Sequence, residues 1–113
     1  MLTGTLPNMR VNCAEIFGPV VTVEPYEEFR DALLQLNDSA YGLQAGVLTH
    51  DAVLIQHAFE ELEVGGVIVG DVPSFRVDQM PYGGVKDSGL GREGLRYSIE
   101  DMTERKLLVM ALH

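Results

Sequence analysis

A carboxylate and an aromatic ring lie directly before a Gly-Pro pair in the segment Glu15-Ile16-Phe17-Gly18-Pro19. Glycine gives the backbone freedom and proline fixes φ and removes a donor, so the pair predicts a tight turn into the apolar run 20–23. Such a turn would hold Glu15 and Phe17 at a strand end, where open α/β sheets often bind ligands. A carboxylate can accept hydrogen bonds from both vicinal hydroxyl groups of a ribose, and an aromatic ring can lie against a sugar or a planar group. The alternative is a surface acid beside a core phenylalanine.

Charged side chains gather in the glycine-rich stretch after residue 70, and the simplest interpretation is a set of salt bridges that pins an irregular loop. The charged residues are Lys86, Asp87, Arg92, Glu93 and Arg96. Within the same stretch, residues 89–94 match the letters of the dinucleotide fingerprint G-x-G-x-x-G. That fingerprint depends on a strand directly before the glycines, and the irregular segment before residue 89 predicts none. We therefore reject a phosphate-binding loop here.

The single cysteine, Cys13, has Asn12 and Ala14 as neighbours and no base or cation to lower its pKa. We expect a buried or half-buried spectator rather than a nucleophile. A lone cysteine forms no internal disulfide, which fits a reducing compartment and a cytoplasmic protein. His50, His57 and His113 are too far apart for a familiar metal-ligand pattern, so no metal site is predicted.

The elements that position these residues alternate between strand and helix. Apolar β-branched runs predict buried strands, and apolar residues at i, i+3, i+4 and i+7 predict helices, with stripes such as Ala52, Ile55, Phe59 and Leu62. The predicted order is strand 20–24, helix from Pro25 to residue 36, strand 43–49, helix 51–63 and strand 67–69. Short connections and right-handed crossovers then give an α/β fold with a parallel βαβαβ sheet and flanking helices.

Regular patterning stops at residue 70. Glycines and prolines punctuate the long loop 70–97, and loops of this length in compact domains are usually functional or disordered. A short helix is predicted over 96–102. The run 105–112 predicts a final strand, apolar on both faces over 107–112, which either packs back onto its own domain or pairs with another chain.

Composition is that of one modest α/β domain of 113 residues, 46% apolar and with a formal charge of −9. A 12.4 kDa globule is expected to bury roughly two-thirds of its unfolded surface. The negative charge argues against nucleic acid, which requires a basic surface, and against an anionic membrane surface. No apolar run approaches the ~20 residues of a membrane span.

The hexapeptide Glu15-Ile16-Phe17-Gly18-Pro19-Val20 resembles a signature of the NAD(P)-dependent aldehyde dehydrogenase superfamily. The resemblance continues through Asn37, 41–43, 65–69 and 81–93, and so covers essentially the whole chain. It implies that residues 1–103 correspond to the C-terminal part of the catalytic domain, and residues 104–113 to a terminal oligomerisation-type strand. Gly70 and Ala14 depart from the family pattern, which commonly has an asparagine and an acid at those positions.

The resemblance implies a reaction in which a cysteine thiolate attacks an aldehyde, hydride passes to NAD or NADP, and water releases the carboxylic acid. It assigns Glu15 and Phe17 to the cofactor, and Phe75 and Tyr82 to the substrate pocket. It gives Glu93 a supporting role in proton transfer, for which a buried carboxyl with a raised pKa would be suited. The family's nucleophile and general base do not match any residue of this chain, so we expect the chain alone to be inactive.

Two further expectations concern partners and substrate. Residues 104–112 are expected to form a homo-oligomer, while nucleic acid and membrane are not expected partners. Arg76, beside Phe75, indicates either a polar or anionic substituent on the aldehyde or a side chain that simply faces solvent. The alternative to an enzyme part is a truncated, non-catalytic assembly or interaction module derived from the same fold.

Overall fold

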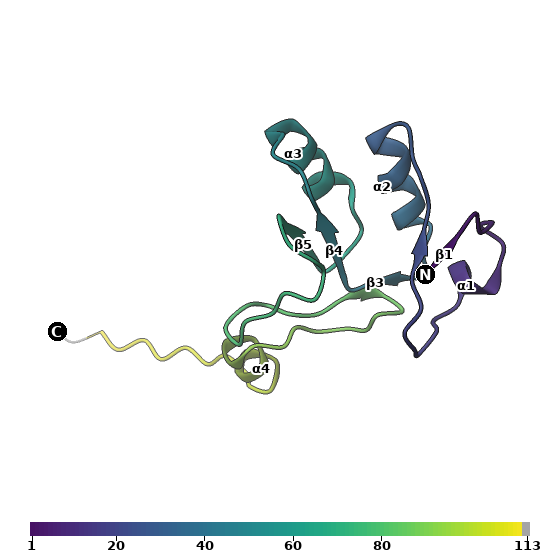
Figure 1. Cartoon of the computed structure of the whole chain (residues 1–113). Helices are drawn as coiled ribbons and strands as arrows, with labels where there is room; N and C mark the ends of the chain where they lie inside the picture. Colours follow the sequence, from purple (N-terminus) through teal and green to yellow (C-terminus); the bar gives the residue numbers. More distant parts are fainter. Residues whose placement is uncertain (112–113) are drawn as a thin grey trace.

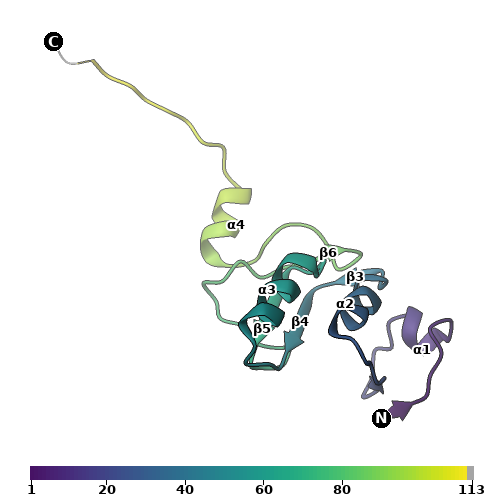
Figure 2. The same cartoon turned by 90° about the horizontal axis from the view of Figure 1, so that it is seen from above.

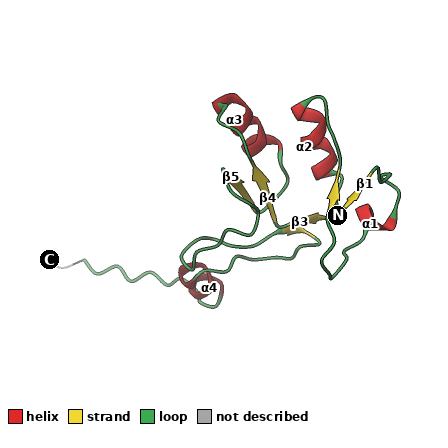
Figure 3. Ribbon diagram, in the orientation of Figure 1, coloured by secondary structure: helices red, strands yellow, loops and turns green. Residues whose placement is uncertain are grey.

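The computed structural model describes residues 1–111, in which helices and strands alternate (Figures 1 and 3). The elements are β1 (Leu2–Thr3), α1 (Arg10–Cys13), β2 (Thr22–Val23), α2 (Phe29–Asn37), β3 (Tyr41–Gly42), β4 (Gln44–Val47), α3 (Ala52–Glu61), β5 (Gly66–Val69), β6 (Val85–Lys86) and α4 (Leu95–Asp101). Leu112 and His113, which belong to the predicted terminal segment, lie outside the described residues.

The central unit is β4–α3–β5, a parallel strand pair connected by a helix. Gln44 lies opposite Gly66, and Val47 lies opposite Val69. Asp51 caps the start of helix α3. Its carboxylate accepts hydrogen bonds from the backbone N–H groups of Val53 at 2.8 Å and Leu54 at 3.3 Å. A capping aspartate satisfies donors that have no partner inside the helix, so this start is well defined by sequence.

The core lies where α2 packs beside this unit, and its buried side chains are Leu33, Ala45, Val47, Ala58 and Leu62. The predicted stripe of α3 is therefore partly wrong. Phe59 is 70% exposed, and the small residue before it is the one that is fully buried. A residue without a bulky side chain lets the helix approach the strands closely, which a phenylalanine would prevent.

The predicted fold class is confirmed, but the sheet is divided rather than continuous. Strand β2 pairs in parallel with β1, where the Leu2 backbone N–H lies 2.8 Å from the Val21 carbonyl oxygen. Strand β3 pairs antiparallel with β6, with Tyr41 opposite Lys86. The predicted strand 20–24 thus does not join the strand that follows α2, because its hydrogen bonds go to residues 2–3 instead.

The predicted terminal strand has no partner among residues 1–111. Residues 104–111 form neither a helix nor a paired strand and extend away from α4 in both views (Figures 1 and 2). Side chains 107–110 are 70–84% exposed. An isolated strand leaves its N–H and C=O groups unpaired, so an edge supplied from elsewhere is required before this run can become a strand. It does not pack back onto the rest of the chain.

The accessible surface is too large for a self-contained domain of this mass. It measures 9366 Å², whereas a folded protein of 12.4 kDa is expected to expose about 6,100 Å². The chain buries about half of its unfolded surface, not the predicted two-thirds. The radius of gyration, 18.7 Å, likewise exceeds the about 13 Å of a compact chain of this length. Large apolar side chains remain uncovered because too few elements are present to cover them.

Candidate functional site

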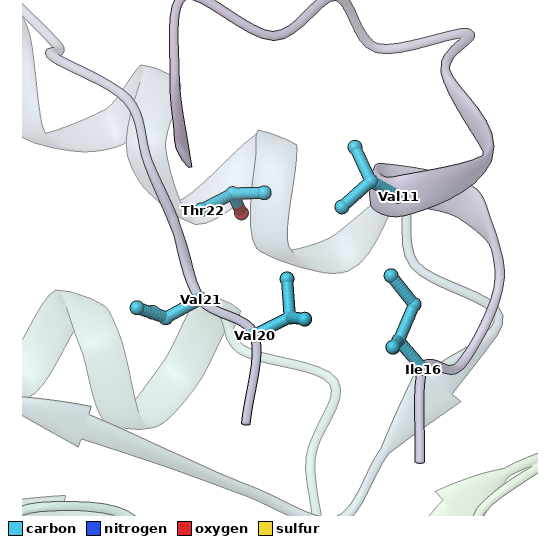
Figure 4. Close-up of a pocket in the computed structure, with 5 residues that line it drawn as sticks. All are labelled: Val11, Ile16, Val20, Val21 and Thr22. Carbon is cyan, nitrogen blue, oxygen red and sulfur yellow. The ribbon is translucent and has the colours of Figure 1, made fainter. Parts of the chain in front are cut away.

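The Gly-Pro turn lies beside an open hollow between α1 and β2. Val11 and Ile16 point toward Val20 and Thr22 across a space of about 270 Å³ (Figure 4). Backbone hydrogen bonds of 2.8 Å, from Gly18 to the Ile16 carbonyl and from Val20 to the Gly18 carbonyl, close the turn. In an extended segment alternate side chains point to opposite sides, so the residues before and after Ile16 face outward.

Those outward residues are Glu15 and Phe17. Phe17 is 99% exposed and is not a core side chain, which removes one half of the alternative interpretation. Glu15 is also exposed, and no ion pair within residues 1–111 includes it. Together with Leu90, Phe17 is among the most exposed large apolar side chains of residues 1–111. A free carboxylate beside a free ring fits a ligand that carries hydroxyl groups and a planar ring.

The second group of predicted residues lies on the loop after β5, which is anchored to β4. The Gln44 side-chain amide donates to the Phe75 carbonyl over 3.3 Å. A Cβ atom at Gly46 would meet the Asp71 carbonyl oxygen at 2.8 Å, so the loop lies directly against the strand. The Phe75 ring itself is 46% exposed.

Three side chains that are distant in sequence meet beyond this anchor. Tyr82 and Glu93 exchange backbone hydrogen bonds of 2.6 and 3.1 Å. The Arg76 guanidinium nitrogen Nη2 lies 2.7 Å from Glu93 Oε2. Its guanidinium carbon lies 4.7 Å from the centroid of the Tyr82 ring, which is cation–π geometry. The structure thus brings two predicted residues, Tyr82 and Glu93, into one cluster with Arg76.

A hollow of about 260 Å³ opens beside this cluster, lined by Leu43, Asp101 and segment 82–93. Backbone segments lie in close contact next to this hollow. A Cβ atom at Gly65 would overlap the carbonyl oxygen of Gly83. Close backbone contact of this kind tolerates glycine only, and it explains the glycines at positions 65 and 83.

Lys86 and Arg92 contact residues outside the predicted charge cluster. The ammonium of Lys86 lies 2.8 Å from the Glu63 carboxylate and 2.6 Å from the Asn37 carbonyl oxygen. Lys86 also adopts a left-handed φ of 55°, a conformation that costs a non-glycine residue free energy and that these contacts offset. Arg92 donates to the Gly84 carbonyl over 2.9 Å. Lys86 thus holds the loop to the end of α2 and to the residue Glu63 after α3, and Arg92 holds the loop to its own backbone.

Two sequence predictions are corrected here. Cys13 is exposed, not buried, and its thiol contacts the Met9 carbonyl oxygen at 3.2 Å, because α1 is a single turn with no element packed over it. Glu93 is 62% exposed rather than buried, because its carboxylate reaches outward to Arg76. Sequence reasoning weighed Arg76 only as a substrate or solvent contact and missed this pair, since no local pattern relates positions 76 and 93.

A third cluster joins the two long helices. His57 Nδ1 lies 3.1 Å and Arg30 Nε 3.2 Å from the Glu61 carboxylate. The hydrogen bond with His57, and to a smaller degree the charge of Arg30, hold the pKa of Glu61 below its usual range.

Within residues 1–111 no group of three histidine, cysteine or acidic side chains is placed to hold a metal ion. No helix in that range has the length and apolarity that a bilayer crossing requires.

The two candidate surfaces lie far apart. The turn that carries Glu15 and Phe17 lies in the chain between α1 and β2, and Glu93, paired with Tyr82, lies just before α4. Helices α1 and α4 are well apart in both views (Figures 1 and 2). The chain therefore supplies two separate parts of a larger surface, not one closed active site.

Comparison with known proteins gives consistent results. The profile of the aldehyde dehydrogenase family matches residues 1–108. The 3-sulfolactaldehyde dehydrogenase of Priestia aryabhattai is 48% identical over 99% of this chain, which spans 24% of that protein. The lactaldehyde dehydrogenase of Methanococcus aeolicus is 43% identical over 94% of the chain and 23% of its own length. The chain thus spans about a quarter of the length of these curated relatives.

Solved structures agree with the sequence matches. Aldehyde dehydrogenase 21 from Physcomitrella patens, in complex with the reaction product succinate, superposes with a TM-score of 0.91 and 47% identity over 96% of this chain and 22% of that one. Betaine aldehyde dehydrogenase from Staphylococcus aureus, in complex with NAD+, gives 0.81 and 38% over 88% and 19%. Glyceraldehyde-3-phosphate dehydrogenase from Methanocaldococcus jannaschii, complexed with NADP, gives 0.73 and 42% over 76% and 19%.

Proposed function

Because this chain belongs to the aldehyde dehydrogenase family, we propose that it is part of an enzyme that oxidises an aldehyde to a carboxylic acid with NAD or NADP. Residues 1–103 form the C-terminal part of the catalytic domain, and the rest of the enzyme supplies the nucleophile and the general base. The net reaction consumes one aldehyde, one water and one oxidised cofactor, and yields the acid, the reduced cofactor and a proton. The isolated chain is inactive.

The observation that carries this proposal is the complete exposure of Phe17 beside the unpaired Glu15. The Glu15 carboxylate would accept hydrogen bonds from the hydroxyl groups of the cofactor ribose, and the Phe17 ring would lie against the cofactor. The bound cofactor supplies the hydride acceptor. The role of these two residues is to orient it, and the turn closed at Gly18 keeps that orientation fixed.

Phe75 and Tyr82 line the aldehyde pocket in this proposal. Both rings lie on the loop that Gln44 anchors to β4, so their positions follow from the sheet. Glu93 supports proton transfer behind the general base. In the chain alone its carboxylate pairs with Arg76, so this role requires the contacts that the rest of the enzyme adds.

The aldehyde itself carries an anionic group. Relatives of this chain are named for 3-sulfolactaldehyde and, in Neptuniibacter caesariensis, for sulfoacetaldehyde, and the Physcomitrella patens structure contains succinate. All three compounds are anions. Lactaldehyde, for which the Methanococcus aeolicus relative is named, is neutral and is the competing substrate. The guanidinium of Arg76, on the pocket loop, favours the anion.

Residues 104–112 join subunits of the complete enzyme into a homo-oligomer. Support comes from the exposed apolar run 107–110, which has no strand partner within residues 1–111.

We place the enzyme in the cytoplasm, since the exposed thiol of Cys13 is free and free thiols persist under reducing conditions.

The test is an assay of the complete enzyme and of the isolated chain, which follows the absorbance of NADH or NADPH with anionic and neutral aldehydes. We expect turnover by the complete enzyme and none by the chain. Turnover by the isolated chain that vanishes in Cys13→Ser would overturn the proposal that the nucleophile lies elsewhere.

A second candidate is a non-catalytic assembly module, favoured by the excess of exposed surface, 9366 Å² for 113 residues. An assembly module would bind a partner chain without any need for the cofactor. Partner binding that is indifferent to NAD, together with no turnover by any larger form of the protein, would support it.

A further inference from the structure

We infer that Lys86 is a positioning residue for Glu93, the side chain proposed to support proton transfer. This inference rests on the proposed function, because it assigns a residue to the part of the enzyme that handles a proton. It starts from the loop 82–93, whose two ends are paired with each other and whose middle is fixed to residues next to the ends of α2 and α3. Lys86 fixes the middle of the loop, and Glu93 lies at one of its ends.

Three oxygen atoms surround the ammonium group of Lys86. They are the carbonyl oxygens of Asn37 at 2.6 Å and Ser39 at 3.3 Å, and a carboxylate oxygen of Glu63 at 2.8 Å. An ammonium has three N–H donors, and these oxygens equal them in number. The side chain is also only 25% exposed. The group therefore serves to join parts of the protein rather than to receive a ligand.

The backbone at Lys86 needs such support. Within residues 1–111, Lys86 is the one residue other than glycine with a left-handed φ, 55°, and this conformation costs a side-chain-bearing residue free energy. The next two residues continue the attachment. The Asp87 N–H donates to the Ala40 carbonyl over 3.0 Å, and the Ser88 hydroxyl accepts the Gly42 N–H over 2.9 Å. Lys86 thus holds a strained turn at the point where the loop meets the sheet.

The position of this turn is transmitted to the other limb of the loop. Arg92 Nη1 donates to the carbonyl of Gly84, the residue directly before β6, over 2.9 Å. A Cβ atom at Gly83 would meet the carbonyl oxygen of Gly91 at 2.5 Å, so the two limbs are in direct backbone contact. Backbone packed this closely cannot shift on one side without a shift on the other.

Glu93 follows at the end of that limb. Its backbone N–H donates to the Tyr82 carbonyl over 2.6 Å, and its carbonyl accepts the Tyr82 N–H over 3.1 Å. Its carboxylate is 62% exposed and pairs with Arg76, and an ion pair between exposed side chains does little to hold either one. The backbone that Lys86 supports therefore determines where the Glu93 carboxyl lies.

The competing explanation is that Lys86 stabilises the loop with no consequence for Glu93. In that case the effects of losing each residue would be independent, and the fold-losses in kcat would multiply in a double variant. A residue that acts through Glu93 has little further effect once that carboxyl is replaced. The double variant therefore separates the two explanations.

The experiment uses the complete enzyme with Lys86→Met, Lys86→Gly, Glu93→Gln and the double variant Lys86→Met with Glu93→Gln. Methionine removes the charge at similar length, and glycine removes the contacts but adopts a left-handed φ without strain. Arg96→Gln is the control, because Arg96 is 78% exposed and its partner Glu100 lies on the same helix. The measurements are kcat, the KM of the cofactor, hydrogen exchange at the Glu93 amide and a thermal melt.

We expect Lys86→Met to lower kcat by about 10- to 100-fold, since a misplacement of about 1 Å can cost that much. The KM of the cofactor should change by less than about twofold, because Glu15 and Phe17 lie on a separate part of the chain. The kcat of the double variant should match that of Glu93→Gln within about twofold. Lys86→Gly should lie between Lys86→Met and the wild type, and the control should match the wild type.

Hydrogen exchange gives a readout that does not depend on turnover. The Glu93 amide is protected by its hydrogen bond with Tyr82, so its exchange should accelerate by about 10-fold or more in Lys86→Met. Exchange within β4 should stay as in the wild type. If Lys86→Met does not fold, Lys86→Gly serves for the same comparisons.

Four results would overturn the inference. They are multiplied losses in the double variant, an unchanged kcat in Lys86→Met, unchanged exchange at Glu93, and a Lys86→Gly variant as slow as Lys86→Met. The last result would mean that the charge of Lys86 matters and not the backbone it holds. Absence of turnover with any aldehyde in the wild type would instead contradict the proposed function. In that event the exchange at Glu93 in Lys86→Met decides the inference, faster exchange in its favour and unchanged exchange against it.

Discussion

The side-chain amide of Asn37 lies 2.6 Å from the carbonyl oxygen of Glu61, at the point where α2 and α3 end next to each other. The oxygen of the same amide accepts the Glu63 backbone N–H over 2.8 Å. One residue at the end of α2 thus satisfies an acceptor and a donor that the end of α3 leaves free. Together with the Lys86 ammonium on the Asn37 carbonyl, it holds the two helices and the following loop in register.

Asn37→Ala should lower the free energy of unfolding by about 1–3 kcal/mol, because the partly buried Glu61 carbonyl and the exposed Glu63 N–H both lose their partner. The loss should be local at first, so hydrogen exchange at the Glu63 amide should accelerate more than exchange within β4. Gln35→Ala, on the exposed face of the same helix, is the control. Equal exchange in both variants would show that the amide contacts contribute nothing to the junction.

Gly65→Ala should destabilise the fold by about 3 kcal/mol, the upper end of the cost of overpacking. The added Cβ would overlap the Gly83 carbonyl oxygen and reach the Gly84 Cα at 3.0 Å, and backbone cannot rotate aside as a flexible side chain can. Gly18→Ala is the matched control, since its Cβ would meet nothing within 4 Å. Thermal melts of the two variants test the difference, and similar melting temperatures would contradict it.

Glu15→Gln in the complete enzyme should weaken cofactor binding by about 10- to 100-fold, since an amide is a poorer acceptor than a carboxylate for ribose hydroxyls. The melting temperature should stay unchanged, because Glu15 is exposed. Titration of cofactor binding and a thermal melt give both quantities, with the exposed Glu27→Gln as a charge-matched control. Unchanged cofactor affinity with a lower melting temperature would assign Glu15 to structure.

The folded-state pKa of Glu61 lies below its usual range, chiefly because of the hydrogen bond with His57 and also because of Arg30, while partial desolvation opposes both. The unfolded chain therefore binds more protons as the pH falls. The stabilisation by Glu61 is present above its unfolded pKa and is lost as the pH falls through the folded-state pKa. Glu61→Gln should be less stable than wild type at neutral pH, and the two melting curves should converge in acid. A difference that does not depend on pH would mean that the ion pairs play no part.

Val109→Lys should reduce self-association through the exposed run 107–110, because a charge on an apolar strand disfavours pairing at the edge. Light scattering after size exclusion should show a smaller assembly or a loss of solubility. Val109→Ile keeps the strand apolar and β-branched, so its assembly should match the wild type. A wild-type protein that stays monomeric over a wide concentration range would contradict the oligomerisation proposal.

The parts of the fold that local signals determine could be predicted from the sequence. Periodicity placed α2 and α3 within a few residues, and β-branched runs placed β4 and β5, whose parallel pairing was confirmed. The start of α2 was wrong: it begins at Phe29, not Pro25. The strands β1, β3 and β6 are two residues long, which is too short for a periodic pattern. Their pairing depends on partners distant in sequence.

In the candidate site, too, single residues could be predicted from the sequence, but contacts between distant residues could not. Glu15 and Phe17 were chosen first from the Gly-Pro turn and their own chemistry, whereas Tyr82 and the role of Glu93 came from the resemblance to a family. Membership in that family was confirmed. The roles of these residues remain predictions. The pair of Arg76 with Glu93 could not be derived from spacing, because β3, β6 and the glycine contacts determine which parts of the loop meet.

The concentration of buried side chains within the β4–α3–β5 unit has a consequence for the order of folding. Four of the five buried apolar residues, Ala45, Val47, Ala58 and Leu62, lie close together in sequence. Short loops lose little entropy on closure, and local contacts form fast. This unit should therefore be the nucleus from which the chain orders itself. The Glu15 turn and the run 104–111, which have little core of their own, should acquire their final geometry last.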